Sequence, residues 1–332
     1  MMRGDEATPL APAAYERDLL SELPILGKIA QVDTQILFRI DSSDMQPEHW
    51  IEIARAVHAA AAEYDGVVVI HGTDTMAYTA SALAFLLPGL AHPVILTGSQ
   101  RPIDKIRTDA RHNLIDAAQL ATKPIPEVGI CFASKLLRGC RTTKVDAWGL
   151  DAFASPNCSA LVKLGVGVDI ARHVLPPRQA LPFDDRLEPR VLAVRLFPGL
   201  DPELLKGALR TGVRGLVLKA FGAGNVPTVQ RSLVGVIEMA HTLDVPVVIT
   251  SQCLRAHVNL RAYVGGAAAH DVGAIGAGDM TDEAALTKLM ITLGRVSEGR
   301  VRAARTAFST VVAGEMTAQE PPVPSSVVAP RF

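Results

Sequence analysis

Cysteine is scarce in this sequence, and neither sign of charge is in excess. Only four of the 332 residues are cysteines, and they form no Cys-x-x-Cys pair and no metal-site spacing. Their distribution predicts free thiols in a reducing compartment. The 33 Lys and Arg residues nearly balance the 34 Asp and Glu residues, so no overall field attracts nucleic acid or an anionic membrane. The cysteines are Cys131, Cys140, Cys158 and Cys253.

Long uninterrupted apolar segments are also lacking. Residues 1–6 are polar and acidic with no apolar stretch behind them, which is not typical of a secretory signal. The least charged window, residues 78–98, is broken by Pro88, Gly89 and Pro93. This break favours a helix, a turn and a strand over a membrane span. We therefore expect a soluble, cytoplasmic protein with no membrane partner.

Several common catalytic and nucleotide-binding motifs are absent. The sequence has no G-x-x-x-x-G-K-[ST] loop and no H-E-x-x-H, and residues 97–101 lack the flanking glycines of a G-x-S-x-G elbow. Residues 221–225 carry only two glycines of a dinucleotide-binding fingerprint and run into Pro227. The nine histidines are scattered. We expect neither a bound metal nor a cofactor.

The sequence does contain a regular alternation of short β-branched runs and helical patterns. Its composition, 48% apolar and 20% charged, is that of a globular chain long enough for two domains. The alternation is typical of a parallel sheet covered by helices on both faces. It predicts strands at residues 67–70, 93–97, 128–132, 191–196, 216–220 and 245–250, and helices at 75–87, 109–121, 202–209, 229–243 and, as a last pair, within 282–309.

The alternation lapses in a polar, proline-rich segment around residues 172–189, which predicts a connector. We therefore predict an α/β fold in two parts. A larger N-terminal domain with a parallel or mixed sheet spans residues 1–172, a linker spans 173–190, and a smaller C-terminal α/β domain spans 191–332. The proline-rich tail from residue 320 onward is expected to be loose.

The segment His71-Gly72-Thr73-Asp74-Thr75 directly follows the predicted strand 67–70. In α/β proteins, ligands bind at this carboxyl end of a strand. One interpretation is helix capping, in which Thr and Asp side chains accept hydrogen bonds from free N–H groups, worth about 1 kcal/mol. The other is a substrate site, in which N–H groups bind an anion and Asp74 binds an ammonium group. The sequence leaves both open.

Two further polar segments follow predicted strands. Residues 138–144 end in Lys144, and are either a solvated basic loop or a functional loop in which Lys144 reaches the Thr73 hydroxyl. A lysine serves as a base only when burial or a neighbouring charge lowers its pKa from about 10.4. Residues 41–45 follow a predicted strand at 36–40. One interpretation of this segment is that Asp44 caps a helix beginning near Pro47. The other is that the hydroxyls of Ser42 and Ser43 bind a substrate carboxylate.

Together these segments resemble the bacterial type I (cytoplasmic) L-asparaginases of the asparaginase/glutaminase family, over nearly the whole chain. The segment at residues 71–82 is similar to the family's second active-site signature. Four more segments match in order, at residues 97–100 (Thr-Gly-Ser-Gln), 141–144 (Arg-Thr-Thr-Lys), 151–157 and 278–281. The resemblance implies an asparaginase-like fold and the hydrolysis of L-asparagine to L-aspartate and ammonia through a threonine acyl intermediate.

The resemblance also implies roles for individual residues. Thr73 and Lys144 correspond to the family's proton-transfer pair, and Asp74 to the residue that binds the substrate α-amino group. Ser42, with Ser43 beside it, corresponds to the residue that binds the α-carboxylate. Asn225 resembles an asparagine contributed by a neighbouring subunit, which implies a homodimer or homotetramer.

One expected segment is missing. The family's primary nucleophile is a threonine in an N-terminal Gly-Gly-Thr-Ile segment, and this sequence contains no such segment. Residues 1–5 instead resemble the start of the mobile lid that follows it, without the lid's tyrosine, and Thr8 has no strand before it. We expect that the sequence begins at an internal methionine and that the missing strand lies upstream. The alternative is a naturally headless, inactive relative.

Two alternatives bear on function, and one further resemblance bears on regulation. A non-catalytic relative would bind asparagine or aspartate in the same pocket without releasing ammonia. A subunit of a tRNA-dependent amidotransferase would pass ammonia to a partner, although such subunits usually carry an extra N-terminal domain. Thr143, Lys219 and Cys253 lie in segments similar to an effector site for asparagine, but Lys219 replaces an expected arginine and lacks its bidentate grip on a carboxylate.

Overall fold

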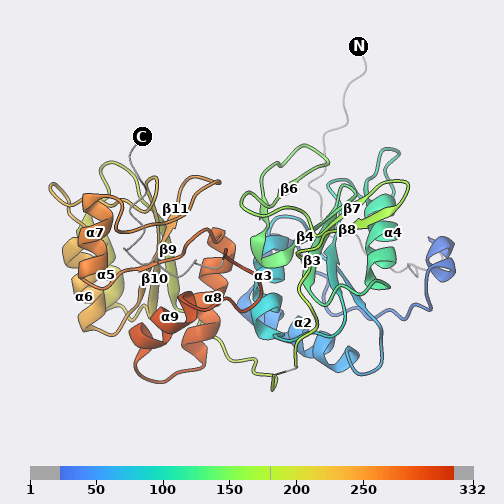
Figure 1. Ribbon diagram of the computed structural model, residues 1–332, viewed down its shortest axis with the longest axis horizontal. Helices are drawn as coiled ribbons and strands as arrows, with labels where there is room; N and C mark the ends of the chain where they lie inside the picture. The colour runs from blue at the N-terminus through green and yellow to red at the C-terminus, as the bar shows by residue number, and fades with distance from the viewer. Residues whose placement is uncertain (1–22, 180, 318–332) are drawn as a thin grey trace, which may run out of the picture.

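The computed structural model describes residues 23–179 and 181–317. Residues 1–22, with Thr8 and the predicted start of the lid, and the tail predicted to be loose from residue 320 lie outside this part. Figure 1 shows two lobes, each built around its own sheet. The predicted fold class is confirmed, since a larger mixed sheet in the N-terminal lobe is followed by a smaller parallel sheet in the C-terminal lobe.

Among the described residues, the N-terminal sheet has six strands in the order β1-β2-β3-β4-β7-β8. The first three are parallel and the last three join antiparallel. A separate pair, β5 and β6, is antiparallel. The strands are β1 (Val67–Ile70), β2 (Val94–Thr97), β3 (Val128–Phe132), β4 (Lys135–Arg138), β5 (Thr143–Lys144), β6 (Phe153–Ala154), β7 (Val162–Leu164) and β8 (Val168–Ile170).

The C-terminal sheet is entirely parallel, in the order β12-β11-β10-β9. Its strands are largely apolar, as expected for a sheet with helices on both faces (Figure 1). They are β9 (Val191–Arg195), β10 (Gly215–Ala220), β11 (Val247–Ser251) and β12 (Ile275–Gly276). The helices of both lobes, within the part of the chain that the structure describes, are α2 (Pro47–Ala60), α3 (Met76–Leu86), α4 (Ala110–Ala121), α5 (Pro202–Arg210), α6 (Val234–Thr242), α7 (Val264–Asp271), α8 (Asp282–Gly294) and α9 (Arg300–Phe308). Residues 23–179 also contain three short 3₁₀ helices, η1 (Pro24–Lys28), η2 (Ser42–Asp44) and η3 (Gly139–Arg141).

Three local predictions differ from the structure. Residues 36–40 were expected to form a strand but do not, and no neighbouring strand pairs with them in the described part of the chain. The helix predicted at 229–243 begins only at Val234, because Arg231 has a φ of 50° and Leu233 N–H closes a turn onto Pro227 O. The cap of α2 is Gln46, which exchanges hydrogen bonds with His49, and not Asp44.

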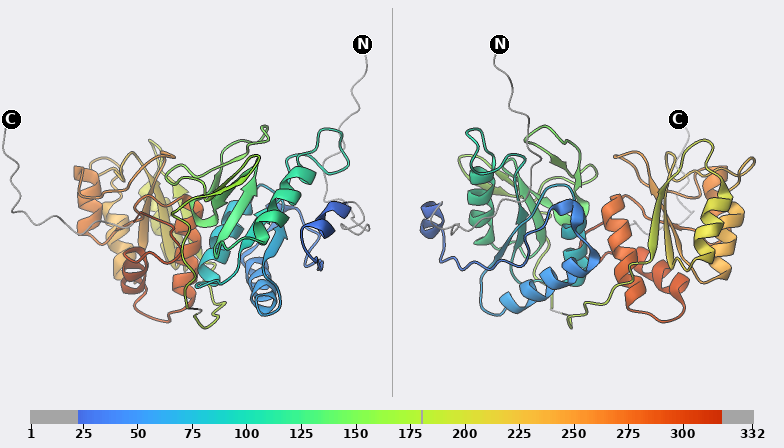
Figure 2. Two further views of the ribbon diagram at one scale, coloured as in Figure 1. Left: turned by 45° about the vertical axis from the view of Figure 1, so that its right-hand side comes forward. Right: turned by 180° about the vertical axis from the view of Figure 1, so that it is seen from behind.

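Helix α3 joins the two lobes. All of its residues except Tyr78 are buried, because it lies between the N-terminal sheet and helix α8 of the other lobe. The two helices lie side by side in Figure 1 and in both views of Figure 2. A helix that is apolar on every side requires such burial. One hydrophobic core therefore includes residues of both lobes, among them Leu83 and Leu289, which are fully buried.

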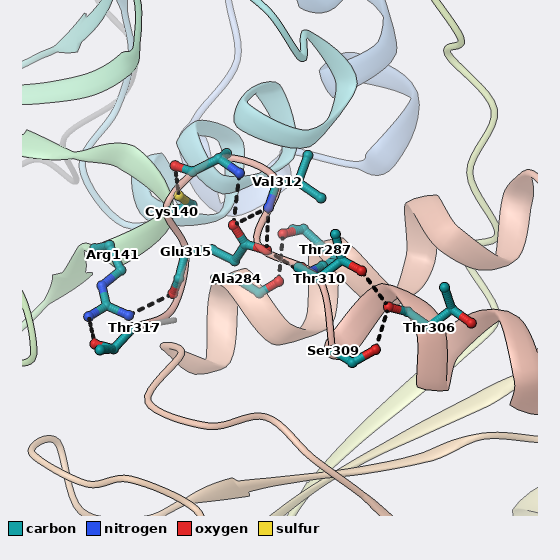
Figure 3. Close-up of polar contacts among 12 residues, drawn as sticks. Cys140, Arg141, Ala284, Thr287, Thr306, Ser309, Thr310, Val312, Glu315 and Thr317 are labelled. Atoms are coloured by element: carbon teal, nitrogen blue, oxygen red, sulfur yellow. Dashed lines mark hydrogen bonds and ion pairs between the residues drawn. The ribbon is translucent and has the colours of Figure 1, made fainter. Parts of the chain in front are cut away.

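Buried polar contacts fix the same interface. The Arg141 guanidinium binds both carboxylate oxygens of Asp279 at 2.8 Å. It also donates to Glu315 O at 2.9 Å. Figure 3 shows Arg141 beside Glu315 and Thr317, which lie on the segment that follows α9. Burial raises the pKa of Asp279, but hydrogen bonds from Arg141 and Thr317 outweigh it and lower that pKa to about 2.

The predicted linker contacts both lobes. Asp185 forms an ion pair with Arg55 of α2 at 2.7 Å, and the ring of Phe183 stacks on His58 at a centroid distance of 4.5 Å. Arg295 donates a hydrogen bond to Asp184 O at 2.9 Å. Residues 183–185 of this proline-rich segment are therefore packed against helices at the base of the two lobes (Figure 1), whereas residues 176–179 are exposed.

We predict that Asp279→Asn lowers the free energy of unfolding by about 3–5 kcal/mol, because it leaves the Arg141 charge buried without a counter-charge. Urea denaturation measures this change. The effect should be about 1 kcal/mol smaller at pH 3 than at pH 6. A carboxyl whose pKa is lowered by folding adds less to the free energy of unfolding as the pH falls below the pKa it has in the unfolded chain. The control is Asp169→Asn at an exposed position of β8, where a change below about 0.5 kcal/mol is expected.

Candidate functional site

The site lies where β1 and β2 end side by side. Ile70 is paired with Thr97 in the parallel ladder, and His71 N–H donates to Thr97 O at 2.8 Å. The segments that follow the two strands, residues 71–75 and 98–101, therefore meet at one edge of the sheet. Ligands bind at this edge in α/β proteins.

Two glycines allow these segments to approach one another. A Cβ atom on Gly98 would lie 2.2 Å from His71 O, and one on Gly72 would lie 2.7 Å from Ser42 Oγ. Neither distance is possible for a real side chain, so both positions require the absence of a Cβ. The turn after β1 therefore packs against β2 on one side and against η2 on the other.

His71 has a structural role in this turn. Its Nδ1 lies 2.6 Å from Gly72 O and must carry the proton, so Nε2 accepts the hydrogen bond from Thr79 Oγ1 at 2.9 Å. Burial lowers the pKa of the imidazole, in line with this neutral form. His71 thus joins the turn to helix α3.

Thr73, Asp74 and Lys144 are in direct contact. Lys144 Nζ lies 2.8 Å from Thr73 Oγ1 and 2.6 Å from Asp74 Oδ1. The Lys144 side chain is 18% exposed and that of Asp74 is 65% exposed. The hydroxyl–amine contact that the functional interpretation of residues 138–144 requires is therefore present.

The alternative of a solvated basic loop for residues 138–144 is wrong. Arg138 and Arg141 are buried, because Arg138 forms an ion pair with buried Glu127 and Arg141 forms the pair with Asp279. After η3, the chain continues as β5, in which Thr143 and Lys144 point to opposite sides. Thr143 Oγ1 donates to Glu283 Oε1 at 2.6 Å in the first turn of α8. Lys144 is thereby directed toward the turn after β1.

The capping interpretation of residues 73–75 is also wrong. Helix α3 begins after Thr75 with no side-chain cap. Thr75 Oγ1 instead donates to Ser42 O at 2.6 Å, and Asp74 N–H donates to Ser42 Oγ at 3.3 Å. Ser42 is therefore part of the site. Ser43 is exposed and its hydroxyl donates to Asp41 Oδ1 at 2.8 Å, so it is engaged locally.

Gln100 belongs to the site and was not among the predicted site residues. Its Oε1 accepts a hydrogen bond from Thr73 Oγ1 at 3.0 Å, and its Nε2 donates to Gly149 O at 3.1 Å. The sequence feature that could have indicated Gln100 is its place in the Thr-Gly-Ser-Gln segment after β2, at the same sheet edge as Thr73. Nothing in that segment favours its amide over the neighbouring Ser99 hydroxyl.

Asn225 is not brought to the other predicted site residues within one chain. It is exposed, lies in the loop after β10 of the C-terminal lobe, and pairs through its backbone with Phe221. Among residues 23–179 and 181–317, no hydrogen bond joins it to Thr73, Asp74 or Lys144.

Two of the three predicted effector residues have partners in the first turn of α8. Lys219 forms an ion pair with Asp282, beside the bond from Thr143 to Glu283. Burial raises the pKa of Glu283. Cys253 is an exposed free thiol on the loop after β11. The effector site stays a prediction.

Two features are absent from the part of the chain that the structure describes. No group of three His, Cys, Asp or Glu side chains there is arranged to hold a metal ion. No helix there is long and apolar enough to cross a membrane.

Both lobes match known protein families. Residues 1–175 match the family described as Asparaginase, N-terminal. Residues 190–308 match the Glutaminase/Asparaginase C-terminal domain.

Individual relatives are similar over most of the chain. The L-asparaginase of Thermococcus kodakarensis is 40% identical over 289 residues, which are 87% of each chain. Its solved structure has a TM-score of 0.83 at 39% identity, covering 90% of this chain and 92% of that chain. L-asparaginase 1 of Escherichia coli (strain K12) is 41% identical over 84% of this chain and 82% of its own length. A glutamyl-tRNA(Gln) amidotransferase component of Methanothermobacter thermautotrophicus is 36% identical over 92% of this chain and 71% of its own.

We predict that Gly98→Ala destabilises the protein by about 1–3 kcal/mol, because the new methyl group must displace the backbone of His71. Thermal unfolding measures the loss. The matched control is Gly207→Ala within α5, where nothing lies within 4 Å of the new Cβ. That change should stabilise the helix by roughly 0.5–1 kcal/mol. Equal effects of the two substitutions would contradict the close approach at Gly98.

Proposed function

This chain belongs to the asparaginase/glutaminase family of amidohydrolases, and we propose that it hydrolyses L-asparagine to L-aspartate and ammonia. We place it with the bacterial type I enzymes in the cytoplasm. The similarity to L-asparaginase 1 of Escherichia coli supports this assignment. The reaction as proposed uses side chains alone, without a metal or cofactor.

The observation that carries the proposal is the contact of 2.8 Å between Thr73 Oγ1 and Lys144 Nζ. A hydroxyl and an amine at this distance can pass a proton between them, which amide hydrolysis requires both at attack and at departure of ammonia. Thr73 and Lys144 therefore act as the proton-transfer pair. Their site lies at the sheet edge where a small substrate has access.

Asp74 and Ser42 hold the substrate in this proposal. The Asp74 carboxylate is 65% exposed and can receive the α-ammonium group while Lys144 remains at its Oδ1. Ser42 is better placed for the α-carboxylate than Ser43. The Ser42 hydroxyl accepts from Asp74 N–H and donates to no acceptor in the described part of the chain, whereas the Ser43 proton is held by Asp41.

We propose that none of the described residues supplies the acyl-forming threonine. The sequence contains no Gly-Gly-Thr segment, and in the part of the chain that the structure describes β1 is an edge strand beside the site. His71 N–H donates to β2, and successive residues of a strand direct their backbone groups to opposite sides. The backbone N–H and C=O groups of Val68 and Ile70 therefore point away from β2, toward the open edge. Ile70 is 58% exposed. A further strand along this edge would bring its carboxyl end next to Thr73.

The proposed enzyme is a homodimer or homotetramer in which Asn225 serves the site of a neighbouring subunit. Asn225 is exposed on the loop after β10. Large exposed apolar side chains lie on the loops that follow β9, β10 and β11 and at the start of α7, which favours an interface there. They are Phe197, Val229, Leu254, Tyr263 and Val264.

Two other functions make different predictions. An inactive relative would bind aspartate without releasing ammonia from asparagine. An amidotransferase component would release ammonia only with its partner. The similarity to the Methanothermobacter amidotransferase is the reason to test this function. Ammonia release without a partner protein, by this chain or by the form extended upstream, separates the proposed asparaginase from both.

We predict that Thr73→Ala and Lys144→Met each abolish ammonia release from asparagine, because each removes one end of the proton-transfer contact. A coupled ammonia assay measures it, on this chain and on a form extended upstream through a Gly-Gly-Thr segment. The control is Lys163→Met at an exposed position of β7, which should leave the rate within about twofold.

The outcomes separate the proposals. Activity of the extended form alone supports the external nucleophile, whereas activity of the 332-residue chain would contradict it. Aspartate binding by both forms without ammonia release would favour the inactive relative. Activity that survives Lys144→Met would refute the assigned pair.

A mixing experiment tests the role of Asn225. Thr73→Ala and Asn225→Ala should each be inactive as pure oligomers. After subunit exchange, each hybrid dimer contains one site with both intact residues, so roughly one quarter of the activity should return on random pairing. No recovery from a verified hybrid would show that Asn225 does not serve a neighbouring site.

A further inference from the structure

The Thr73 hydroxyl lies between a donor and an acceptor. A charged lysine has only donors, so Lys144 Nζ donates to Thr73 Oγ1 at 2.8 Å. Gln100 Oε1 has only lone pairs, so Thr73 donates its single hydroxyl proton to it at 3.0 Å. The proton of Thr73 therefore points away from Lys144, and a lone pair points toward it.

The orientation of the Gln100 amide is determined by its other end. Gln100 Nε2 lies 3.1 Å from Gly149 O and 3.5 Å from Asp146 O. A flipped amide would place its oxygen against these two carbonyl oxygens. The Asp146 carboxylate in turn accepts hydrogen bonds from Trp148 N–H at 2.7 Å and Gly149 N–H at 2.9 Å, which fixes the loop that presents them.

The backbone of Gln100 is fixed separately. Asp109 Oδ2 accepts from Gln100 N–H and Oδ1 from Arg101 N–H, both at 3.0 Å. Asp109 is buried and is also bound by Asn113 Nδ2 at 3.1 Å. Both ends of the Gln100 side chain are thus fixed by the N-terminal lobe, independently of Thr73.

We infer that Gln100 is a positioning residue that directs the Thr73 hydroxyl. This rests on the proposed function, and it assigns a further residue to the same site. A neutral amide accepts the hydrogen bond without taking the proton. Gln100 therefore holds the hydroxyl proton away from the amine and keeps a lone pair of Oγ1 on the line to Lys144 Nζ, along which a proton can return from the ammonium to Thr73.

Two substitutions separate this role from packing. Gln100→Met keeps the length of the side chain and removes both polar groups, whereas Gln100→Glu retains an acceptor for Thr73 and loses the donor to Gly149. In whichever form of the protein releases ammonia, Gln100→Met should lower kcat at least about tenfold with KM within about threefold. Gln100→Glu should recover part of that loss. The control Gln119→Met, on α4, should match the wild type.

A second measurement does not depend on activity. Three-bond couplings from the Thr73 methyl carbon to the backbone N and C′ report its χ1 rotamer by NMR. We expect one rotamer in the wild type, in Gln100→Glu and in Gln119→Met, and rotamer averaging in Gln100→Met. If no form hydrolyses asparagine, the proposed function fails while this measurement still tests the positioning.

Three results would overturn the inference. A single unchanged Thr73 rotamer in Gln100→Met would show that the amide does not hold the hydroxyl. A raised KM with unchanged kcat would make Gln100 a substrate contact instead. Equal loss in Gln100→Met and Gln100→Glu, by both measurements, would show that the acceptor is not what matters.

Discussion

The close approach of β1 and β2 at their carboxyl ends is the constraint on which the site depends. It exists because position 98 has no Cβ atom, since one would lie 2.2 Å from His71 O. The parallel register then places Thr73 of one loop within hydrogen-bonding distance of Gln100 of the other. Neither loop makes the site alone, because the hydroxyl comes from one strand end and its acceptor from the next.

The amine reaches this edge through contacts with the other lobe. Lys144 lies on a two-residue strand, and the residues just before it are bound to Asp279 and Glu283 across the interface. A strand this short cannot hold its own position by ladder bonds alone. The geometry of the proposed proton-transfer pair in the N-terminal lobe therefore depends on the correct packing of α8 against α3.

Prediction from sequence succeeded where a pattern reflects burial on both faces of a sheet. Residues 67–70 and 128–132 are strands with the bounds expected. It failed where the outcome depends on a distant partner. Residues 36–40 have the composition of a strand but no strand beside them to pair with in the described part of the chain. The arginines of residues 138–144 look solvated locally and are buried, because carboxylates far away in the sequence neutralise them.

The sequence by itself determined the α/β class, most strand positions and the segments that carry Thr73 and Lys144, because these follow from local apolar periodicity and from motifs of adjacent residues. Only the tertiary structure decided which polar groups meet. In the structure Thr73 and Asp74 do not cap a helix, and the Ser43 hydroxyl is bound to Asp41. Gln100 accepts the hydrogen bond from the Thr73 hydroxyl. Hydrogen bonds act over about 3 Å, and residues 71 positions apart reach that distance only when the whole sheet and the second lobe are in place.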